Sequence, residues 1–278
     1  MRVPLLVPRL SSVLAVLAVL ACTAPLFASS EARAGDFLAR QRRFPRVKAA
    51  FEQHHVALED SFRAAGAAWP PRALFIRSFK NEAITELWAA AAHGDEPHVL
   101  VRSFPICMNS GALGPKRREG DLQVPEGFYR VSLFNPSSSY HLSLGVSYPN
   151  AADRFHSAGQ PPGGAIMIHG SCVTIGCIPL QDGPIEQLYL AAVLARDAGQ
   201  ADIPIHIFPC RLDDPNCQAR LTAEAATRPE LAAFWDGLLP GYLAFLQTGA
   251  PPRVVAKKDG TYQLDPPRER RPLIAAGE

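Results

Sequence analysis

Three features are scarce in this sequence, and each absence excludes a class of protein. The formal net charge of the 278 residues is only +2, so composition gives no argument for a nucleic-acid partner. Apart from one apolar run at residues 11–28, there is no long hydrophobic segment, which excludes a protein that crosses a membrane many times. No internal repeat is present, which excludes a repeat architecture. An apolar fraction of 47% instead fits one folded domain with a sizeable core and an extension.

The single apolar run predicts export. Two arginines precede residues 11–28, and residues 32–34 (Ala-Arg-Ala) offer a cleavage site. We therefore predict a signal peptide over residues 1–34 and a mature protein in the periplasm. Two alternatives also imply export. An uncleaved membrane anchor is disfavoured because Pro25 interrupts the run, and a lipoprotein attached at Cys22 would need a smaller residue than leucine two positions earlier.

Cysteines are few, and export makes them informative. Removal of the signal peptide takes away one of six and leaves five: Cys107, Cys172, Cys177, Cys210 and Cys217. An odd number in a compartment that permits disulfides means at least one free thiol or an intermolecular bond. Cys210 and Cys217 bound the turn-rich loop CRLDDPNC, so we expect them to form a structural disulfide.

Short apolar stretches at close spacing predict a β-rich α+β fold. Residues 73–90 alternate in polarity and indicate two strands joined by a polar turn at residues 80–82. A helix is expected to start at a cap on Asp182 and to end at Gly199. Further strands are expected at residues 98–107, at the end of 111–134, and at 141–149, 164–170 and 203–208.

Helical segments flank this central domain, which we place at residues 72–210. Residues 35–70 are charged and helix-prone, and residues 211–249 form a helical extension that ends in a helix pair broken at Pro240. Residues 250–278 are rich in proline and charge, which predicts a poorly ordered tail.

The stretch IMIHGSCVTIGCIPL, residues 166–180, carries the candidate chemistry. His169 and Cys177 are eight residues apart, which is about 26 Å on one extended strand and too far for contact. Gly170 and Gly176 supply the freedom for a chain reversal that would bring the two together. An imidazole beside a thiol favours the nucleophilic thiolate, and the N–H of Cys177 could stabilise an oxyanion. These elements suit acyl transfer from an amide.

The spacing alone leaves three alternatives open. His169 could be a core histidine with its hydrogen bonds satisfied. His169, Cys172 and Cys177 could bind zinc, although a fourth ligand would have to come from elsewhere. Cys172 and Cys177 could also form a disulfide. We predict no metal and no cofactor.

Two sequence motifs resemble the L,D-transpeptidase (YkuD-type) family, and they are most similar to its YafK-like subgroup. The first is His169-Gly170 followed by Thr174-Ile175-Gly176-Cys177. The second lies upstream, at Gly114-Pro115-Lys116, Gly120-Asp121 and Pro125-Glu126-Gly127-Phe128-Tyr129. The segment YPNAADR at residues 148–154 also matches the subgroup, and the resemblance covers about residues 72–210.

The resemblance implies an exported cell-wall enzyme with a β-sandwich-like catalytic domain. Such an enzyme attacks a peptidoglycan stem peptide and forms an acyl-cysteine intermediate. Cys177 would be the nucleophile and His169 the general base. Gly176, Gly170 and Thr174 would contact the oxyanion or the substrate. If Cys172 pairs with Cys107, Cys177 remains the free thiol that this chemistry needs.

One departure from the family pattern bears on the outcome of the reaction. The family motif continues with an arginine after the residue that follows the cysteine, and this sequence has Pro179 there. Members of the YafK-like subgroup are associated with hydrolysis that detaches a murein lipoprotein from peptidoglycan. We therefore keep two alternatives to transpeptidation: such a hydrolase, and a catalytically silent peptidoglycan-binding module.

Other polar and aromatic residues support weaker interpretations. Residues 116–118 (Lys-Arg-Arg) indicate a solvated basic loop more than a binding site for carboxylates. His141 and His156 could reach the site, but a surface or core position is the simpler expectation. The three tryptophans, Trp69, Trp88 and Trp235, are expected to pack in the core.

Overall fold

The computed structural model describes residues 35–92 and 97–265. The predicted signal peptide and the last part of the predicted tail, residues 266–278, lie outside the described residues. Within the described residues, no helix is both long and apolar enough to cross a membrane.

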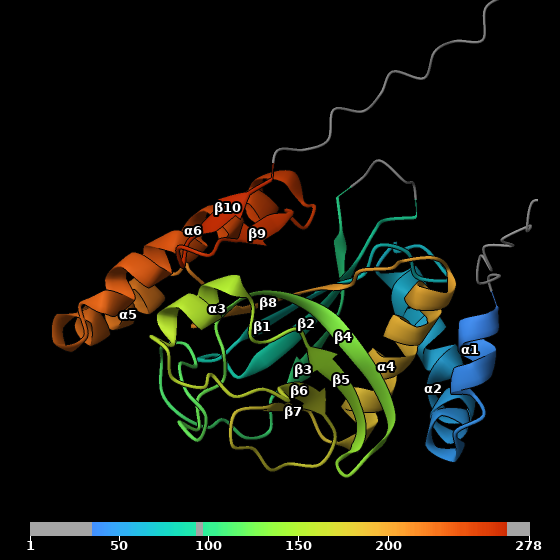
Figure 1. Cartoon of the computed structure of the whole chain (residues 1–278). Coiled ribbons are helices and arrows are strands. Elements are labelled where there is room, and N and C mark those ends of the chain that lie inside the picture. The colour runs from blue at the N-terminus through green and yellow to red at the C-terminus, as the bar shows by residue number, and fades with distance from the viewer. Residues whose placement is uncertain (1–34, 93–96, 266–278) are drawn as a thin grey trace, which may run out of the picture. The chain divides into compact units, whose positions relative to one another are not determined.

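The centre of the fold is a mixed sheet of eight strands in the order β3-β2-β1-β8-β4-β5-β6-β7 (Figure 1). Neighbouring strands are antiparallel except for β1 with β8 and β6 with β7, which are parallel. The strands are β1 (Phe75–Phe79), β2 (Ile84–Ala89), β3 (Val99–Pro105), β4 (Gly127–Ser138), β5 (His141–Val146), β6 (Met167–His169), β7 (Ile178–Pro179) and β8 (Pro204–Phe208). These include the strands expected from the sequence.

The long strand β4 joins the two halves of this sheet. Residues 127–130 pair with β8, and residues 131–138 pair with β5. The pairing with β5 shifts register twice, and such irregularities let a long strand bend. The predicted β-rich α+β class is confirmed, with one large curled sheet whose halves share β4.

Helix α4 (Asp182–Asp197) packs its apolar side chains against the sheet. The predicted cap is wrong in detail. Gln181 occupies the N-cap position, and Asp182 is the first helical residue. The carboxylate of Asp182 instead accepts a hydrogen bond from the backbone N–H of Ser171 at 2.8 Å. The helix start is therefore tied to the loop that follows β6.

The N-terminal helices are part of the main core. Helix α1 (Asp36–Gln41) and helix α2 (Pro45–Ala64) both pack against α4. Leu58 and Phe62 of α2 are fully buried in the same cluster as the sheet residues. Each such side chain contributes about 1.5–3 kcal/mol when buried. The segment at residues 35–70 therefore shares the core of the sheet.

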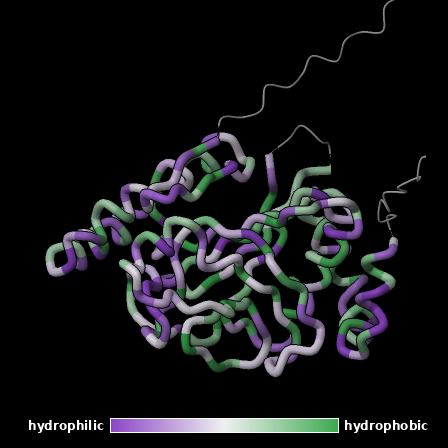
Figure 2. Tube along the Cα trace, in the orientation of Figure 1, coloured by the Kyte–Doolittle hydropathy of each residue, from purple (hydrophilic) through white to green (hydrophobic). Residues whose placement is uncertain are grey.

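The C-terminal helices build a second apolar cluster against the sheet. Helix α5 (Pro215–Thr227) and helix α6 (Glu230–Thr248) carry both hydrophobic and hydrophilic residues (Figure 2). The predicted break at Pro240 is wrong, because α6 continues through it. A proline inside a helix costs about 3 kcal/mol. Burial of Trp235 and Leu238 before the proline, and of Tyr242 and Phe245 after it, offsets that cost.

The predicted poorly ordered tail is corrected over residues 254–264. Strands β9 (Val254–Ala256) and β10 (Tyr262–Leu264) form a two-stranded antiparallel sheet. The ring of Tyr262 packs edge-on against Phe128 of β4, with ring centroids 4.9 Å apart. An aromatic contact with β4 thus stabilises a segment whose composition alone suggests disorder. The short helix α3 (Ala151–His156) lies between β5 and β6 in the chain.

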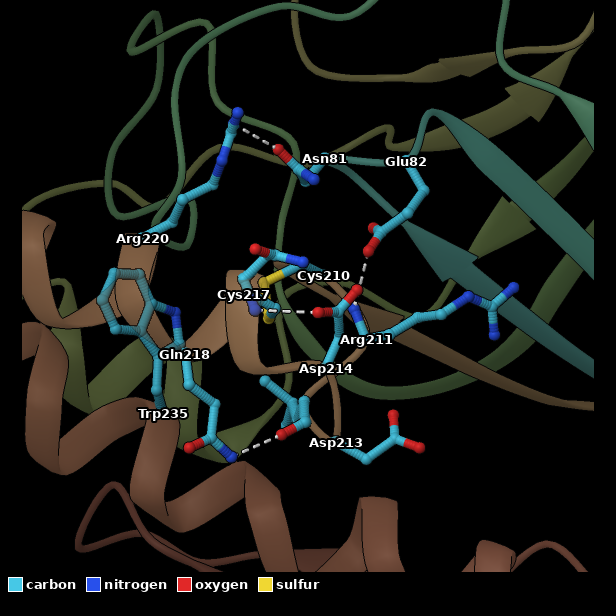
Figure 3. Close-up of a disulfide and its surroundings, with 12 residues drawn as sticks. Asn81, Glu82, Cys210, Arg211, Asp213, Asp214, Cys217, Gln218, Arg220 and Trp235 are labelled. Atoms are coloured by element: carbon cyan, nitrogen blue, oxygen red, sulfur yellow. Dashed lines mark hydrogen bonds between the residues drawn. A yellow bond between two sulfur atoms is a disulfide. The ribbon is translucent and has the colours of Figure 1, made fainter.

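A disulfide between Cys210 and Cys217 links the end of β8 to α5, as predicted (Figure 3). Around it, the backbone N–H of Arg211 donates to Glu82, and Arg220 donates to Asn81. Residues 81 and 82 belong to the β1–β2 turn, so these bonds fasten the C-terminal extension to the sheet.

Replacing both Cys210 and Cys217 by alanine is expected to lower the free energy of unfolding by about 2–3 kcal/mol, the entropy of a loop of this length. Urea denaturation of the oxidised protein and of the double variant measures the difference. Reduction should lower the stability of the wild-type protein more than that of the double variant, because both lose the Cys107–Cys172 bond and only the wild type also loses Cys210–Cys217. Unchanged stability of the double variant would contradict the prediction.

Candidate active site

The parallel pairing of β6 with β7 brings His169 and Cys177 to one face of the sheet. Ile168 pairs with Ile178, so Cys177, one residue earlier, lies beside Met167. Side chains two apart on a strand share a face, so Met167 and His169 point away from the core that holds Ile168. The intervening loop therefore makes the predicted reversal. It places the candidate nucleophile, Cys177, directly before the strand that pairs with that of the candidate base, His169.

Both glycines in this loop occupy places where a side chain would not fit. Gly176 has φ +137°, and a Cβ there would lie 3.0 Å from the carbonyl oxygen of Gln123. A Cβ on Gly170 would lie 2.6 Å from a carboxylate oxygen of Asp182 and 2.9 Å from His141. Close backbone approach on both sides is the physical reason for glycine at these two positions.

The imidazole of His169 is buried and held in one orientation. Its Nδ1 lies 2.5 Å from the carbonyl oxygen of Gly170. A carbonyl can only accept, so Nδ1 carries the proton and Nε2 of the neutral ring is free to accept one. Burial lowers the pKa of His169, and the Gly170 carbonyl opposes that shift in part. The ring is therefore neutral near pH 7.

Cys177 is only partly exposed, and this partial burial of the thiol raises its pKa. The backbone N–H of Met167 and the charge of Lys116 act in the opposite direction. The thiol is therefore protonated at neutral pH and needs a base to become a nucleophile. A neutral thiol beside a neutral imidazole fits general-base activation better than a preformed ion pair.

For the chemistry expected from the sequence, acyl transfer to Cys177 with His169 as the base, these two shifts predict how the rate depends on pH. The rate needs His169 neutral, and its pKa lies below 6.5, so the rate should rise with pH through a midpoint below 6.5. It should then stay level across neutral pH, because the thiol ionises only at higher pH. A pH profile of kcat/KM checks both limbs, and an acid limb centred above pH 7 would contradict the assignment.

Thr174 folds the loop that precedes the thiol. Its hydroxyl accepts from the N–H of Gly176 at 3.0 Å and donates to the carbonyl oxygen of Cys177 at 2.7 Å. The N–H of Gly176 is thus already bonded within the loop. In this structure Gly176 and Thr174 therefore shape the loop. The backbone N–H of Cys177 is the remaining candidate to donate a hydrogen bond to an oxyanion.

The second disulfide joins Cys107 to Cys172 and fastens the same loop to the segment after β3. Cys177 is the free cysteine among the described residues. A disulfide-bonded Cys172 can neither pair with Cys177 nor serve as a thiolate ligand for zinc, so both alternatives fail for this form of the protein. No group of three metal-ligating side chains is close enough to hold an ion anywhere in residues 35–92 and 97–265.

The expectation of a solvated basic loop is wrong for Lys116. This side chain is only 5% exposed, and its ammonium pairs with Asp121 at 2.7 Å. The other oxygen of Asp121 accepts from the backbone of Arg117 and Arg118. Burial alone would raise the pKa of Asp121, but the bonds from Lys116 and the backbone outweigh it and lower the pKa. The loop is therefore built around one ion pair next to the thiol.

Several weaker expectations can be placed as well. His156 hydrogen bonds to the carbonyl oxygen of Gly260, and His141 hydrogen bonds to Glu186. These hydrogen bonds direct both histidines to partners other than the Cys177 thiol. The three tryptophans pack against other side chains, as expected. Tyr140, which stacks on His169, had no sequence signal, because its place at a turn gives no hint of its neighbour.

The family comparison identifies the domain that carries this site. The model of the YkuD family, described as the L,D-transpeptidase catalytic domain, matches residues 82–203. The chain is 35% identical over 196 residues to YafK of Escherichia coli K12, which has a provisional L,D-transpeptidase name. That alignment covers 70% of this chain and 74% of YafK. YafK of Escherichia coli O157:H7 matches to the same extent.

Among solved structures, this chain is similar to the helical cell shape determining protein Pgp2 of Campylobacter jejuni. The TM-score is 0.40 and the identity 16%, with 72% of this chain and 80% of Pgp2 covered. Bd1075 of Bdellovibrio bacteriovorus gives a TM-score of 0.35 at 19% identity, with 51% of this chain and 50% of Bd1075 covered.

Proposed function

Since this chain belongs to the L,D-transpeptidase family, we propose that it is an exported cysteine enzyme that acts on peptidoglycan stem peptides. The observation that supports this most directly is the site itself. It combines the free Cys177 with a buried, neutral His169 whose Nδ1 is held by Gly170. Two disulfides suit an oxidising compartment such as the periplasm, and residues 1–34 have the composition of a signal peptide.

The proposed reaction has two stages that share one base. Nε2 of His169 takes the proton of Cys177 as Sγ attacks the carbonyl carbon of the stem peptide. The backbone N–H of Cys177 donates to the oxyanion, and Gly170 and Gly176 let the loop pack closely against Asp182 and Gln123, which fixes its position. His169 then gives the proton to the leaving amine, and an acyl-cysteine remains. An incoming amine or water resolves it, with His169 again acting as the base.

Which acceptor is used decides between transpeptidase and hydrolase. The family's arginine is replaced by Pro179, which is buried in β7 and accepts from the N–H of Cys107. Strand β7 itself carries no basic side chain. An acceptor held through its carboxylate therefore has one partner fewer here.

An apolar rim, formed by the loop before Cys177 and two segments joined to it, favours the hydrolase as the second candidate. We define this rim as four side chains that are 44–76% exposed: Met108, Leu122, Val173 and Ile175. They belong to the loop before Cys177 and to two segments joined to it by the Cys107–Cys172 disulfide and the Gly176–Gln123 contact. Stem peptides are short and polar, whereas a murein lipoprotein linked to one would bring apolar side chains to such a surface.

Product analysis separates the candidates. Wild-type protein and Cys177→Ala are incubated with tetrapeptide stems plus an amine acceptor, and with stems that carry a lipoprotein-derived peptide through its lysine. A new cross-link that Cys177→Ala does not form establishes a transpeptidase, and release of the lysine-bearing peptide establishes a hydrolase. Binding without any product would support the silent module and overturn the enzymatic proposal.

The rim makes a quantitative prediction. Val173→Ser together with Ile175→Ser should lower kcat/KM for a lipoprotein-linked stem by about tenfold, the effect of losing one or two apolar contacts. Turnover of a free tetrapeptide should change little, because such a stem is polar and brings no apolar side chains to the rim. Steady-state kinetics on the two substrates checks this, and an equal loss on both would show that the loop was distorted.

A further inference from the structure

Helix α2 lies outside the residues matched by the family model, yet it contacts the turn that covers His169. This turn, residues 138–141, connects β4 to β5. The guanidinium of Arg46 donates from one nitrogen to the carbonyl oxygens of Ser138 and His141, at 2.6 and 2.7 Å. These two bonds hold both ends of the turn from a single side chain of α2.

A second bridge fixes the same turn from the side. Glu186 of α4 accepts from Nε2 of His54 on α2 and from Nε2 of His141, each at 2.7 Å. All three side chains are largely shielded from solvent. One carboxylate therefore joins α2, α4 and the start of β5. Helices α2 and α4 pack along each other, so the bridge joins two elements that are already in contact (Figure 1).

Residues 138–141 also restrict the ring of His169. The ring of Tyr140 stacks on His169 with centroids 4.8 Å apart and planes inclined by 30°. A Cβ on Gly170 would lie 2.9 Å from both the Tyr140 carbonyl oxygen and the Cβ of His141. Gly170, directly after His169, already contacts the turn. A displacement of the turn would therefore move the imidazole or remove the Tyr140 ring that covers it.

We propose that Tyr140 is a positioning residue for His169, and that Arg46 and His54 of α2 act through it as positioning residues. The N-terminal helix then belongs to the catalytic apparatus in addition to the core. The proposal rests on the proposed function, since it gives His169 the role of base. It also goes beyond it, because it assigns a catalytic contribution to a helix that carries none of the family's motifs.

A purely structural role for these residues is the competing explanation, and the chain offers matched controls. Lys48 lies on the same helix as Arg46, with its side chain largely exposed. His55 neighbours His54, but its ring packs against Phe51 and edge-on against Trp69. Lys48→Ala and His55→Ala therefore perturb α2 without releasing the turn, and Tyr140→Phe keeps the stacked ring.

The test uses two readouts on the mature protein. The first is the rate at which iodoacetamide alkylates Cys177, which needs no peptidoglycan substrate. The second is kcat and KM on the stem peptide that the wild type turns over. Tyr140→Ala, Arg46→Ala and His54→Ala should each lower both the alkylation rate and kcat by about tenfold, with KM and Tm near the wild-type values. Tyr140→Phe and both controls should match the wild type.

The outcomes separate this proposal from the proposed function. Losses that appear equally in His55→Ala, or that follow a fall in Tm, would overturn the positioning role. Unchanged rates in all three variants, with His169→Gln still impaired, would overturn it as well. If the three variants lose alkylation rate while the wild type turns over no stem peptide, the positioning of His169 stands and the proposed substrate fails.

Discussion

Replacing His169 by glutamine should lower kcat/KM on stem peptides by about 10³-fold. The thiol of Cys177 is protonated at neutral pH because burial raises its pKa, so without a base few molecules hold a thiolate. Glutamine has nearly the size of histidine and can keep the hydrogen bond to the Gly170 carbonyl, but it cannot accept a proton. Steady-state kinetics near pH 7 measures the loss.

The same variant has an internal check. At a pH high enough to ionise the thiol, the deficit of His169→Gln should shrink, because the base is no longer needed to form the thiolate. Tm should stay near that of the wild type. A loss of less than tenfold at pH 7, or a deficit that stays constant as pH rises, would mean that His169 is not the base.

The second large effect concerns stability. Replacing Glu126 by alanine should lower the free energy of unfolding by about 3–5 kcal/mol. The carboxylate of Glu126 is fully buried and accepts from Lys80 at 2.9 Å, from the N–H of Gly114 and from the indole N–H of Trp235. Its removal leaves the ammonium of Lys80 buried without its counter-charge. Urea denaturation followed by circular dichroism provides the measurement.

Two further variants test the cause. Glu119→Ala removes an exposed carboxylate from the same loop and should change stability by less than about 0.5 kcal/mol. The double variant Lys80→Met/Glu126→Leu replaces the pair by apolar side chains and should be more stable than Glu126→Ala alone. If the double variant were no more stable, the uncompensated charge would not be the reason for the loss.

The strands and the Cys210–Cys217 disulfide followed from the sequence because local patterns encode them. The alternation around residues 80–82 predicted the β1–β2 hairpin, and the spacing of Cys210 and Cys217 predicted their bond. The glycines on both sides of Cys172 predicted the reversal between His169 and Cys177. In each case the signal and the structure involve neighbouring residues, so no knowledge of the rest of the fold was needed.

The errors share a different cause, which is packing in the folded protein that the local sequence pattern does not show. Pro240 was expected to break a helix, but apolar burial on both sides of it outweighs the lost hydrogen bond. Residues 254–264 have a disordered composition, but Tyr262 packs on Phe128 of β4. Lys116 was assigned to a solvated loop because its pairing with Asp121 depends on how that loop folds.

The central claim is that Cys177 forms an acyl-enzyme with a peptidoglycan stem peptide. Intact-mass spectrometry of the mature protein, quenched in acid after brief mixing with stem peptides, tests it directly. The account predicts an added mass equal to the acyl part of the stem on the wild type, absent from Cys177→Ala and accumulating more slowly in His169→Gln. An adduct that survives in Cys177→Ala, or turnover by that variant, would contradict it.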